Sequence, residues 1–212
     1  MADQAGYLNR NSARRKYQTP AGRLFCVEGV DGTGKTTVAR HLAKRLNATY
    51  LRTPPASFRA LRKKIDRSAE PVTRFFFYLS SVHAAADEIA ELLTHGDVVC
   101  DRYIESTFAY HEALGLIIPN KETYYQHIIT PAWTIVLHAD ERVLVQRLAS
   151  RMQKRRSDSA MELDRVFQKA VDDRYRRLDA LHVDTTDQNP VQTADHIMSV
   201  IAPEVAARRK AG

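Results

Sequence analysis

Short apolar runs alternate along the chain with longer segments in which apolar residues recur every three or four positions. The first pattern is typical of buried strands, and the second places apolar side chains on one face of a helix, as with Val38, Leu42 and Leu46. The predicted strands are Leu24–Glu28, Ala48–Leu51, Asp97–Cys100, Trp133–His138 and His182–Asp184. The predicted helices are Thr36–Leu46, Arg59–Arg67, Phe75–Leu93, Ser106–Gly115, Thr123–Ile129, Asp140–Gln153, Asp164–Leu181 and Pro190–Ile201.

The alternation of strands and helices predicts the fold class. We expect a three-layer α/β protein, in which a parallel five-stranded sheet carries helices on both faces. Ligands of such sheets bind beyond the carboxyl ends of the strands, so the chemistry should follow Glu28, Leu51, Cys100 and His138. A single domain is expected over residues 22–206, between a flexible basic arm (1–21) and a basic tail (207–212).

The composition is that of an ordinary globular protein. Of the 212 residues, 44% are hydrophobic, and no run approaches the roughly 18 apolar residues of a membrane span. The first residues lack the apolar segment of a secretory signal, so we expect a cytoplasmic protein with no membrane partner. Cys26 and Cys100 lie inside predicted strands, where a cysteine is usually a small core residue rather than half of a disulfide.

The net charge of +7 arises partly from the two ends and partly from a cluster between Arg147 and Arg156. A basic balance is compatible with nucleic acid, a membrane surface or small anionic substrates. We expect the ends to be solvated, and we do not expect a nucleic-acid partner. The internal cluster is better explained by a small anionic substrate.

A glycine-rich segment follows the first predicted strand and matches the phosphate-binding pattern G-x-x-x-x-G-K-[ST], known as the P-loop. Glycines let the backbone approach phosphate oxygens, Lys35 reaches the outer phosphates, and the Thr36 hydroxyl binds Mg²⁺. The alternative is a glycine-rich turn with an incidental lysine, but the position between a strand and a helix favours phosphate binding. The candidate phosphate-binding residues are Gly29, Asp31, Gly32, Thr33, Gly34, Lys35, Thr36 and Thr37.

An acidic and a basic residue, Asp101 and Arg102, follow the third predicted strand directly. An aspartate at this point beside a P-loop is well placed to hold Mg²⁺, and an arginine fork suits a phosphate. The alternatives are a helix or turn cap for Asp101 and a surface position for Arg102.

Arginines also follow one another at the end of the helix predicted from Asp140. Arg147, Arg151 and Arg155 are four apart and share a helix face, where like charges favour a bound anion. We interpret residues 147–160 as a lid whose arginines neutralise transferring phosphates. The alternative is a solvated basic helix end. The candidate catalytic residues are then Lys35, Asp101, Arg102 and Arg151.

Two segments, 28–37 (EGVDGTGKTT) and 101–110 (DRYIESTFAY), together resemble the thymidylate kinases. Weaker similarity extends over 131–140 and 164–178, so the resemblance covers about residues 22–201. It implies a P-loop nucleoside monophosphate kinase that transfers the γ-phosphoryl group of Mg·ATP to an acceptor monophosphate. A homodimer is also implied.

The resemblance implies roles for individual residues. Asp31 would meet the sugar 3′-hydroxyl, and Arg52 and Arg102 would hold the acceptor phosphate. Ser106 and Tyr110 would line the acceptor pocket.

The acceptor half departs from the family pattern. The run 75–83 (FFFYLSSVH) offers Tyr78 as the aromatic that stacks on the base, but Val82 occupies the position of the thymine-reading arginine. Both residues are expected to line the acceptor pocket. His111 replaces a frequent glutamine, and Thr53 and Pro54 follow Arg52 where the family has another signature. A (deoxy)pyrimidine monophosphate is expected, and its base stays open.

Two other classes of function compete with this one. A nucleoside kinase acting on a 5′-hydroxyl would need a carboxylate base, for which Glu28 and Glu105 are the candidates in sequence. A non-kinase nucleotide-binding switch would carry a guanine-reading N-K-x-D segment, and the sequence has none.

Overall fold

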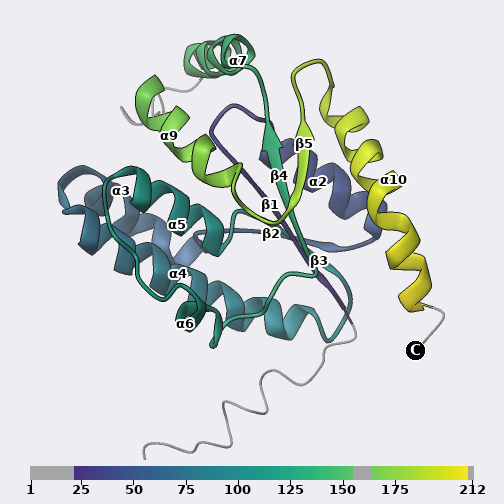
Figure 1. The fold of residues 1–212 in the computed structure, drawn as a ribbon. Helices are drawn as coiled ribbons and strands as arrows, with labels where there is room; N and C mark the ends of the chain where they lie inside the picture. Colours follow the sequence, from purple (N-terminus) through teal and green to yellow (C-terminus); the bar gives the residue numbers. More distant parts are fainter. Residues whose placement is uncertain (1–21, 155–163, 210–212) are drawn as a thin grey trace, which may run out of the picture.

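The computed structural model describes residues 22–154 and 164–209, with side chains except at 151–154 and 204–209. In these residues five strands pair in parallel, in the order β2-β3-β1-β4-β5 (Figure 1). The predicted parallel five-stranded sheet is thereby confirmed. The strands are β1 (Leu24–Gly29), β2 (Thr49–Arg52), β3 (Val98–Asp101), β4 (Trp133–His138) and β5 (Leu181–Asp184).

Helices cover both faces of the sheet (Figure 1). One face packs against α2 and α10, and the other packs against α4, α5 and α9. Within the described residues, no helix combines the length and apolar character needed to span a membrane. The helices are α2 (Lys35–Leu46), α3 (Arg59–Ser68), α4 (Pro71–Leu92), α5 (Ile104–Ala113), α6 (Glu122–Tyr125), α7 (Glu141–Lys154), α9 (Arg165–Tyr175) and α10 (Pro190–Arg209), with a short 3₁₀ helix η1 at Ala56–Phe58.

The central strand β1 is buried along its whole length, which explains its unbroken apolar sequence. Phe25 and Val27 face the α2 and α10 side, while Leu24 and Cys26 face α4. Cys26 in β1 and Cys100 in β3 lie opposite each other in the strand register, and both are buried free thiols. The expectation that they are core residues is confirmed.

Two predicted helices are shorter than expected. The segment 123–129 is helical only within α6, because the chain turns after Tyr125 and buries Ile128 before entering β4. The helix predicted to reach Leu181 ends at Tyr175, because successive turns reverse the chain so that Leu181 can begin β5. In both segments the apolar residues that follow the helix pack in the core but belong to irregular backbone. The spacing of apolar residues alone does not distinguish such a segment from a helix.

Strand order brings the functional segments together at one edge of the sheet. The carboxyl ends of β1 and β3 are neighbours, and β2 and β4 flank them. The P-loop after β1 and the segment after β3 therefore face each other at the place where α/β sheets bind ligands.

Candidate active site

The P-loop spans residues 29–37 and connects β1 to α2. Gly29 has φ +133°, and a Cβ there would lie 2.3 Å from the Leu137 carbonyl oxygen of β4. Gly32 has φ +92°, a conformation that L side chains rarely adopt. The Thr33 hydroxyl donates to the Val30 carbonyl at 2.9 Å, which holds the loop in shape. Gly29 is thus required because the β4 backbone approaches it closely, and Gly32 because the turn needs a positive φ.

Lys35 is the first residue of α2, and its side chain is 6% exposed. Its Nζ donates to the Val30 carbonyl at 2.5 Å and lies 3.9 Å from the Asp31 carboxylate. Burial and, to a smaller extent, the nearby Arg102 lower the pKa of Lys35 to about 7, against the opposing effect of Asp31. The negative groups near the buried ammonium only partly offset the cost of its burial, so a bound anion would stabilise its charged form.

Asp101 ends β3 and lies next to Thr36, as the sequence predicted. The Thr36 hydroxyl donates to Asp101 Oδ2 at 2.6 Å, and the same oxygen lies 3.5 Å from Arg52 Nε. The other oxygen, Oδ1, is buried and has no hydrogen-bond partner among the described residues. A buried, unsatisfied carboxylate oxygen beside a hydroxyl is a donor set that fits a hard cation such as Mg²⁺.

Arg102 has φ +70°, which is unusual for a residue other than glycine. This backbone conformation directs its guanidinium back toward the P-loop, where it donates to Asp31 Oδ1 at 2.6 Å and Ser106 Oγ at 3.1 Å. It also donates to the Tyr110 hydroxyl at 3.2 Å. Burial alone would lower the pKa of Arg102, but Tyr110 and Asp31 raise it, so the side chain stays charged. Strained backbone of this kind gathers at functional sites.

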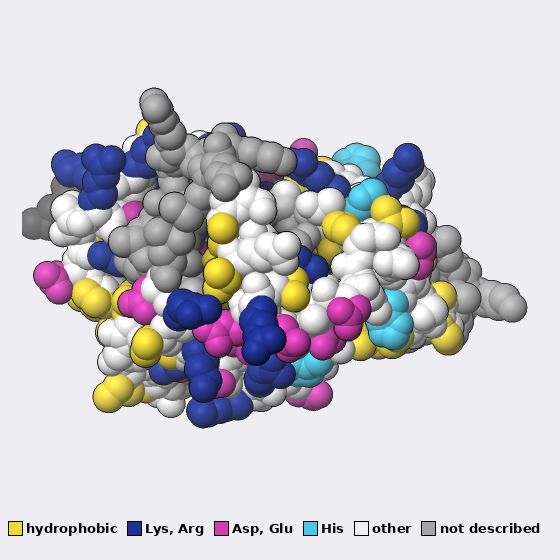
Figure 2. All heavy atoms as spheres, turned by 90° about the horizontal axis from the view of Figure 1, so that it is seen from above, with side chains coloured by type: hydrophobic (Ala, Val, Ile, Leu, Met, Phe, Trp, Pro, Cys, Tyr) yellow, Lys and Arg dark blue, Asp and Glu magenta, His cyan; other side chains and the backbone are white. Residues whose placement is uncertain are grey.

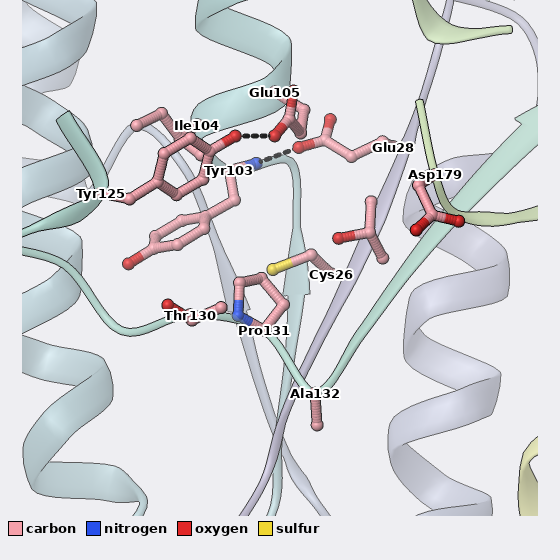
Figure 3. A pocket seen from close by; sticks show the side chains of 11 residues that line it. Cys26, Glu28, Tyr103, Ile104, Glu105, Tyr125, Thr130, Pro131, Ala132 and Asp179 are labelled. Atoms are coloured by element: carbon pink, nitrogen blue, oxygen red, sulfur yellow. Dashed lines mark hydrogen bonds between the residues drawn. The ribbon is translucent and has the colours of Figure 1, made fainter. Parts of the chain in front are cut away.

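Glu28 is completely buried and points toward the Tyr103 backbone, which directly follows Arg102 (Figure 3). Its carboxylate accepts hydrogen bonds from the Tyr103 backbone N–H at 2.7 Å, the Ser106 hydroxyl at 2.6 Å and the Tyr175 hydroxyl at 3.2 Å. Burial raises the pKa of Glu28, although the bond from Ser106 opposes this. Glu28 therefore fixes the segment that carries Arg102, a positioning role that the sequence did not reveal.

Glu105 is the other carboxylate considered as a base. It accepts a hydrogen bond from the Tyr125 hydroxyl, in the same cavity that Glu28 borders (Figure 3). Burial raises the pKa of Glu105. Both carboxylates are thus occupied by protein donors.

Arg147 is the one lid arginine whose side chain the structure describes. It donates to the Thr185 carbonyl at 2.6 Å and the Thr185 hydroxyl at 3.0 Å, and it approaches the Gly32 carbonyl at 3.5 Å. Arg147 therefore lies beside the P-loop, and its contact with a phosphate stays a prediction. The Arg151 side chain, Arg155 and the lid residues 155–160 lie outside the described part of the chain.

The base-reading positions are only partly as expected. The Tyr78 hydroxyl donates to Asp66 at 2.8 Å and accepts from Arg62 at 3.1 Å, and its ring lies 5.7 Å from His111. Val82 is 2% exposed and packs in the core between α4 and the sheet. The expectation that Val82 lines the acceptor pocket is wrong, because its side chain points inward from α4.

Tyr175 and Thr185 belong to the site but were absent from the sequence interpretation. Tyr175 reaches Glu28 from α9, and the Thr185 hydroxyl donates to the His138 carbonyl at 2.9 Å and lies 3.2 Å from the Thr33 carbonyl. Thr185 directly follows β5, so its place at the carboxyl edge was the available signal. Tyr175 lies within a regular apolar helix pattern and offered none.

The view from above faces the end where β4 and β5 terminate, and it shows basic and acidic side chains interspersed over that surface (Figure 2).

A phosphate cradle, a carboxylate suited to Mg²⁺ and a second cationic group in the facing segment define a P-loop phosphotransferase.

Comparison with known proteins identifies the family. The family model described as thymidylate kinase matches residues 27–193. A probable thymidylate kinase from Pyrobaculum calidifontis is 32% identical over 152 residues, covering 68% of this chain and 78% of that protein. The mitochondrial UMP-CMP kinase 2 of Homo sapiens is 30% identical over 178 residues, covering 79% of this chain and 39% of the longer protein. The thymidylate kinase structure from Candida albicans has a TM-score of 0.73 at 20% identity, covering 88% of this chain and 94% of that one.

The chain belongs to the thymidylate kinase family. It is a phosphotransferase of the nucleoside monophosphate kinase type. The resemblance of the P-loop and of residues 101–110 to this family is confirmed.

Proposed function

We propose that this protein transfers the γ-phosphoryl group of Mg·ATP to a pyrimidine nucleoside monophosphate, with dTMP as the first acceptor to test. The observation that carries the proposal is the position of Arg102. It presents a buried, charged fork beside Ser106 and Tyr110, directly opposite the P-loop. A second anion site next to a triphosphate site suits an acceptor phosphate.

The chain's own groups account for the transfer by position and charge. Lys35 and the P-loop backbone hold the donor phosphates, and Arg102 holds the acceptor phosphate in line with them. An acceptor phosphate is already an anionic nucleophile, so no carboxylate base is required. Glu28 and Glu105 already accept bonds from protein donors, which favours a monophosphate over a nucleoside hydroxyl.

Asp101 and Thr36 would hold the magnesium ion. The buried Oδ1 of Asp101 has no partner among the described side chains and backbone, which supports this assignment. When bound, the ion neutralises charge on the donor phosphates. The homodimer and the cytoplasmic location stay predictions.

A panel of acceptors tests the proposed function. The protein is mixed with Mg·ATP and each of dTMP, dUMP, dCMP, UMP, CMP, AMP and GMP, and separately with thymidine, and ADP release is followed. We expect turnover on a pyrimidine monophosphate. The family name points to dTMP, and the name of the human relative points to UMP and CMP. Turnover of thymidine without turnover of any monophosphate would refute the proposal.

An Asp101→Asn variant tests the magnesium assignment. The amide keeps the shape of the side chain but removes the negative charge that a divalent cation needs. We expect kcat/KM to fall by about 10²-fold and the Mg²⁺ concentration for half-maximal rate to rise at least about tenfold. Asp173→Asn, at an exposed position of α9, is the matched control and should stay within about twofold. An unchanged Mg²⁺ titration would show that Asp101 does not serve the metal.

A further inference from the structure

Two histidines lie side by side near the carboxyl edge of the sheet, one on each of its last two strands. His138 ends β4 and is buried, while His182 in β5 is exposed. Val136 is the register partner of His182 and packs toward α9, so both histidine side chains lie on the α9 side of the sheet. His138 Nε2 lies 2.8 Å from His182 Nδ1, and the two ring planes differ by only 18°. Neither ring belongs to the phosphate cradle, so phosphate binding does not explain their contact.

The outer nitrogens of this histidine pair both face acceptors. His138 Nδ1 lies 2.8 Å from Asp172 Oδ1 on α9, and His182 Nε2 lies 3.0 Å from the Leu178 carbonyl oxygen. An ionised carboxylate and a carbonyl only accept, so each of these nitrogens must carry a proton. The link between the rings needs a third proton, because two bare nitrogens would repel each other. Two neutral imidazoles carry only two protons, so the complete chain of bonds holds one positive charge.

The charged groups around the histidine pair favour the third proton. Asp172 also accepts from Arg176 Nε at 2.7 Å, and Asp184 of β5 interacts electrostatically with His138. Burial alone would raise the pKa of Asp172, but the bonds to His138 and Arg176 lower it, so the carboxylate stays ionised. Two carboxylates and one guanidinium therefore surround the pair, and their net negative charge stabilises an imidazolium.

The helix that carries Asp172 also supports the active site. Gln168, Asp172 and Tyr175 follow one another at spacings of four and three residues and therefore share one face of α9. Gln168 Oε1 accepts from the Asp31 backbone N–H at 3.4 Å. The Tyr175 hydroxyl donates to Glu28 at 3.2 Å. The contact of Asp172 with the histidine pair lies between these two along the helix, and it anchors the same face to β4.

We propose that His138 and His182 share one positive charge and act as positioning residues, which hold α9 against the sheet edge through an ion pair with Asp172. A charge-assisted bond of this kind is roughly twice as strong as a neutral one. When the pH rises, the third proton leaves to solvent from the exposed ring of His182, and the bond to Asp172 becomes that of a neutral imidazole. The face of α9 that carries Gln168 and Tyr175 is then held less firmly.

Nitrogen-15 NMR of the histidine rings in the ligand-free protein tests the shared charge without any turnover. Over a titration from pH 5 to pH 10, we expect the pair to lose its two charges in two separate steps, with an intermediate state in which three of the four ring nitrogens are protonated. In Asp172→Asn the second step should move to lower pH by about one unit or more, because the amide does not stabilise the imidazolium. Rings that titrate independently, or a second step that is unchanged in Asp172→Asn, would overturn the proposal.

The ratio of kcat/KM for the acceptor between Asp172→Asn and wild type tests the positioning role, and this part rests on the proposed kinase function. The ratio removes the titration of groups common to both proteins, such as Lys35. We expect a loss of roughly three- to tenfold at pH 6.5 that shrinks to within about twofold at pH 9.5, because wild type loses its own ion pair as the pH rises. Asp173→Asn, at an exposed neighbouring position of α9, is the matched control and should match wild type throughout. A loss that is independent of pH would show a merely structural role for Asp172.

Thermal unfolding of the same ligand-free proteins separates this proposal from the kinase function. If no acceptor is phosphorylated by any of them, the proposed function fails. Tm of Asp172→Asn should still lie roughly 2–4 °C below that of wild type at pH 6.5, with a smaller difference at pH 9.5. A difference in Tm that is absent at pH 6.5 or grows toward pH 9.5 would overturn the charged contact between α9 and the histidine pair.

Discussion

A Lys35→Met variant is expected to lose about 10³-fold in kcat/KM while its ligand-free form becomes more stable than wild type. Methionine fills similar space but carries no charge for the donor phosphates. The loss should appear with every acceptor, because it removes charge stabilisation from the transferring group itself. Opposite effects on activity and stability are the signature of a group held in a strained state for function.

The gain in stability follows from the lowered pKa of Lys35. The folded value of about 7 lies below the ordinary 10.5, so the folded protein binds this proton less well than the unfolded chain does. Below pH 7 the charged form carries the full penalty. Between pH 7 and 10.5 only the unfolded chain still binds the proton, so the penalty falls steadily as the pH rises and is gone above 10.5. After allowing for the Val30 carbonyl left without its partner, the variant should gain roughly 2 kcal/mol at pH 6.

Thermal unfolding of the ligand-free proteins from pH 6 to pH 10 measures this effect. Tm of the variant should exceed that of wild type by roughly 4–8 °C at pH 6, and the difference should shrink as the pH rises. Lys44→Met is the control, since Lys44 is exposed on the same helix. A difference in Tm that is absent at pH 6 or grows toward pH 10 would contradict the assigned cause.

The donor half of the site could be predicted from sequence because local pattern and strand order both determine it. The P-loop is a contiguous motif, and its glycines fix their own turn conformations. Asp101 and Arg102 follow a strand that becomes the neighbour of β1, so the carboxyl edge brings Asp101 to Thr36 without further information.

The acceptor half depends on how helices are rotated against the sheet, which a motif does not fix. The assignment of Val82 assumed that four-residue spacing from Tyr78 places both side chains on one ligand-facing side. The helix instead buries a face with alternating spacings of four and three residues, and Tyr78 lies at its edge. That core face comprises Phe75, Leu79, Val82, Ala86 and Ile89.

Tyr175 lay beyond sequence reasoning for a different physical reason. It contributes through one polar atom in an otherwise ordinary segment, and its partner is distant in sequence. Tyr175 meets Glu28 across 147 positions of the chain. Such contacts are fixed by tertiary packing, after the elements themselves have formed.

An Arg102→Lys variant is expected to lose about 10²–10³-fold in kcat/KM for the acceptor monophosphate while binding ATP almost normally. Lysine keeps the charge but replaces a planar fork with a single ammonium. It cannot contact Asp31, Ser106 and Tyr110 together as the guanidinium does. The acceptor phosphate would then lose its orientation toward the donor, and orientation is the main contribution that the protein makes to phosphoryl transfer.

Steady-state kinetics and calorimetry separate this role from donor binding. The KM of the acceptor should rise and kcat should fall, while the Kd of Mg·ATP changes by no more than about threefold, because Lys35 and the P-loop backbone hold the donor. Arg45→Lys is the matched control, since Arg45 forms a surface ion pair with Asp195 at 2.5 Å and should tolerate the same exchange. A loss shared equally by ATP affinity would place Arg102 on the donor phosphates. The second anion site opposite the P-loop would then have to be sought at Arg52, which lies 3.5 Å from Asp101 and is partly exposed.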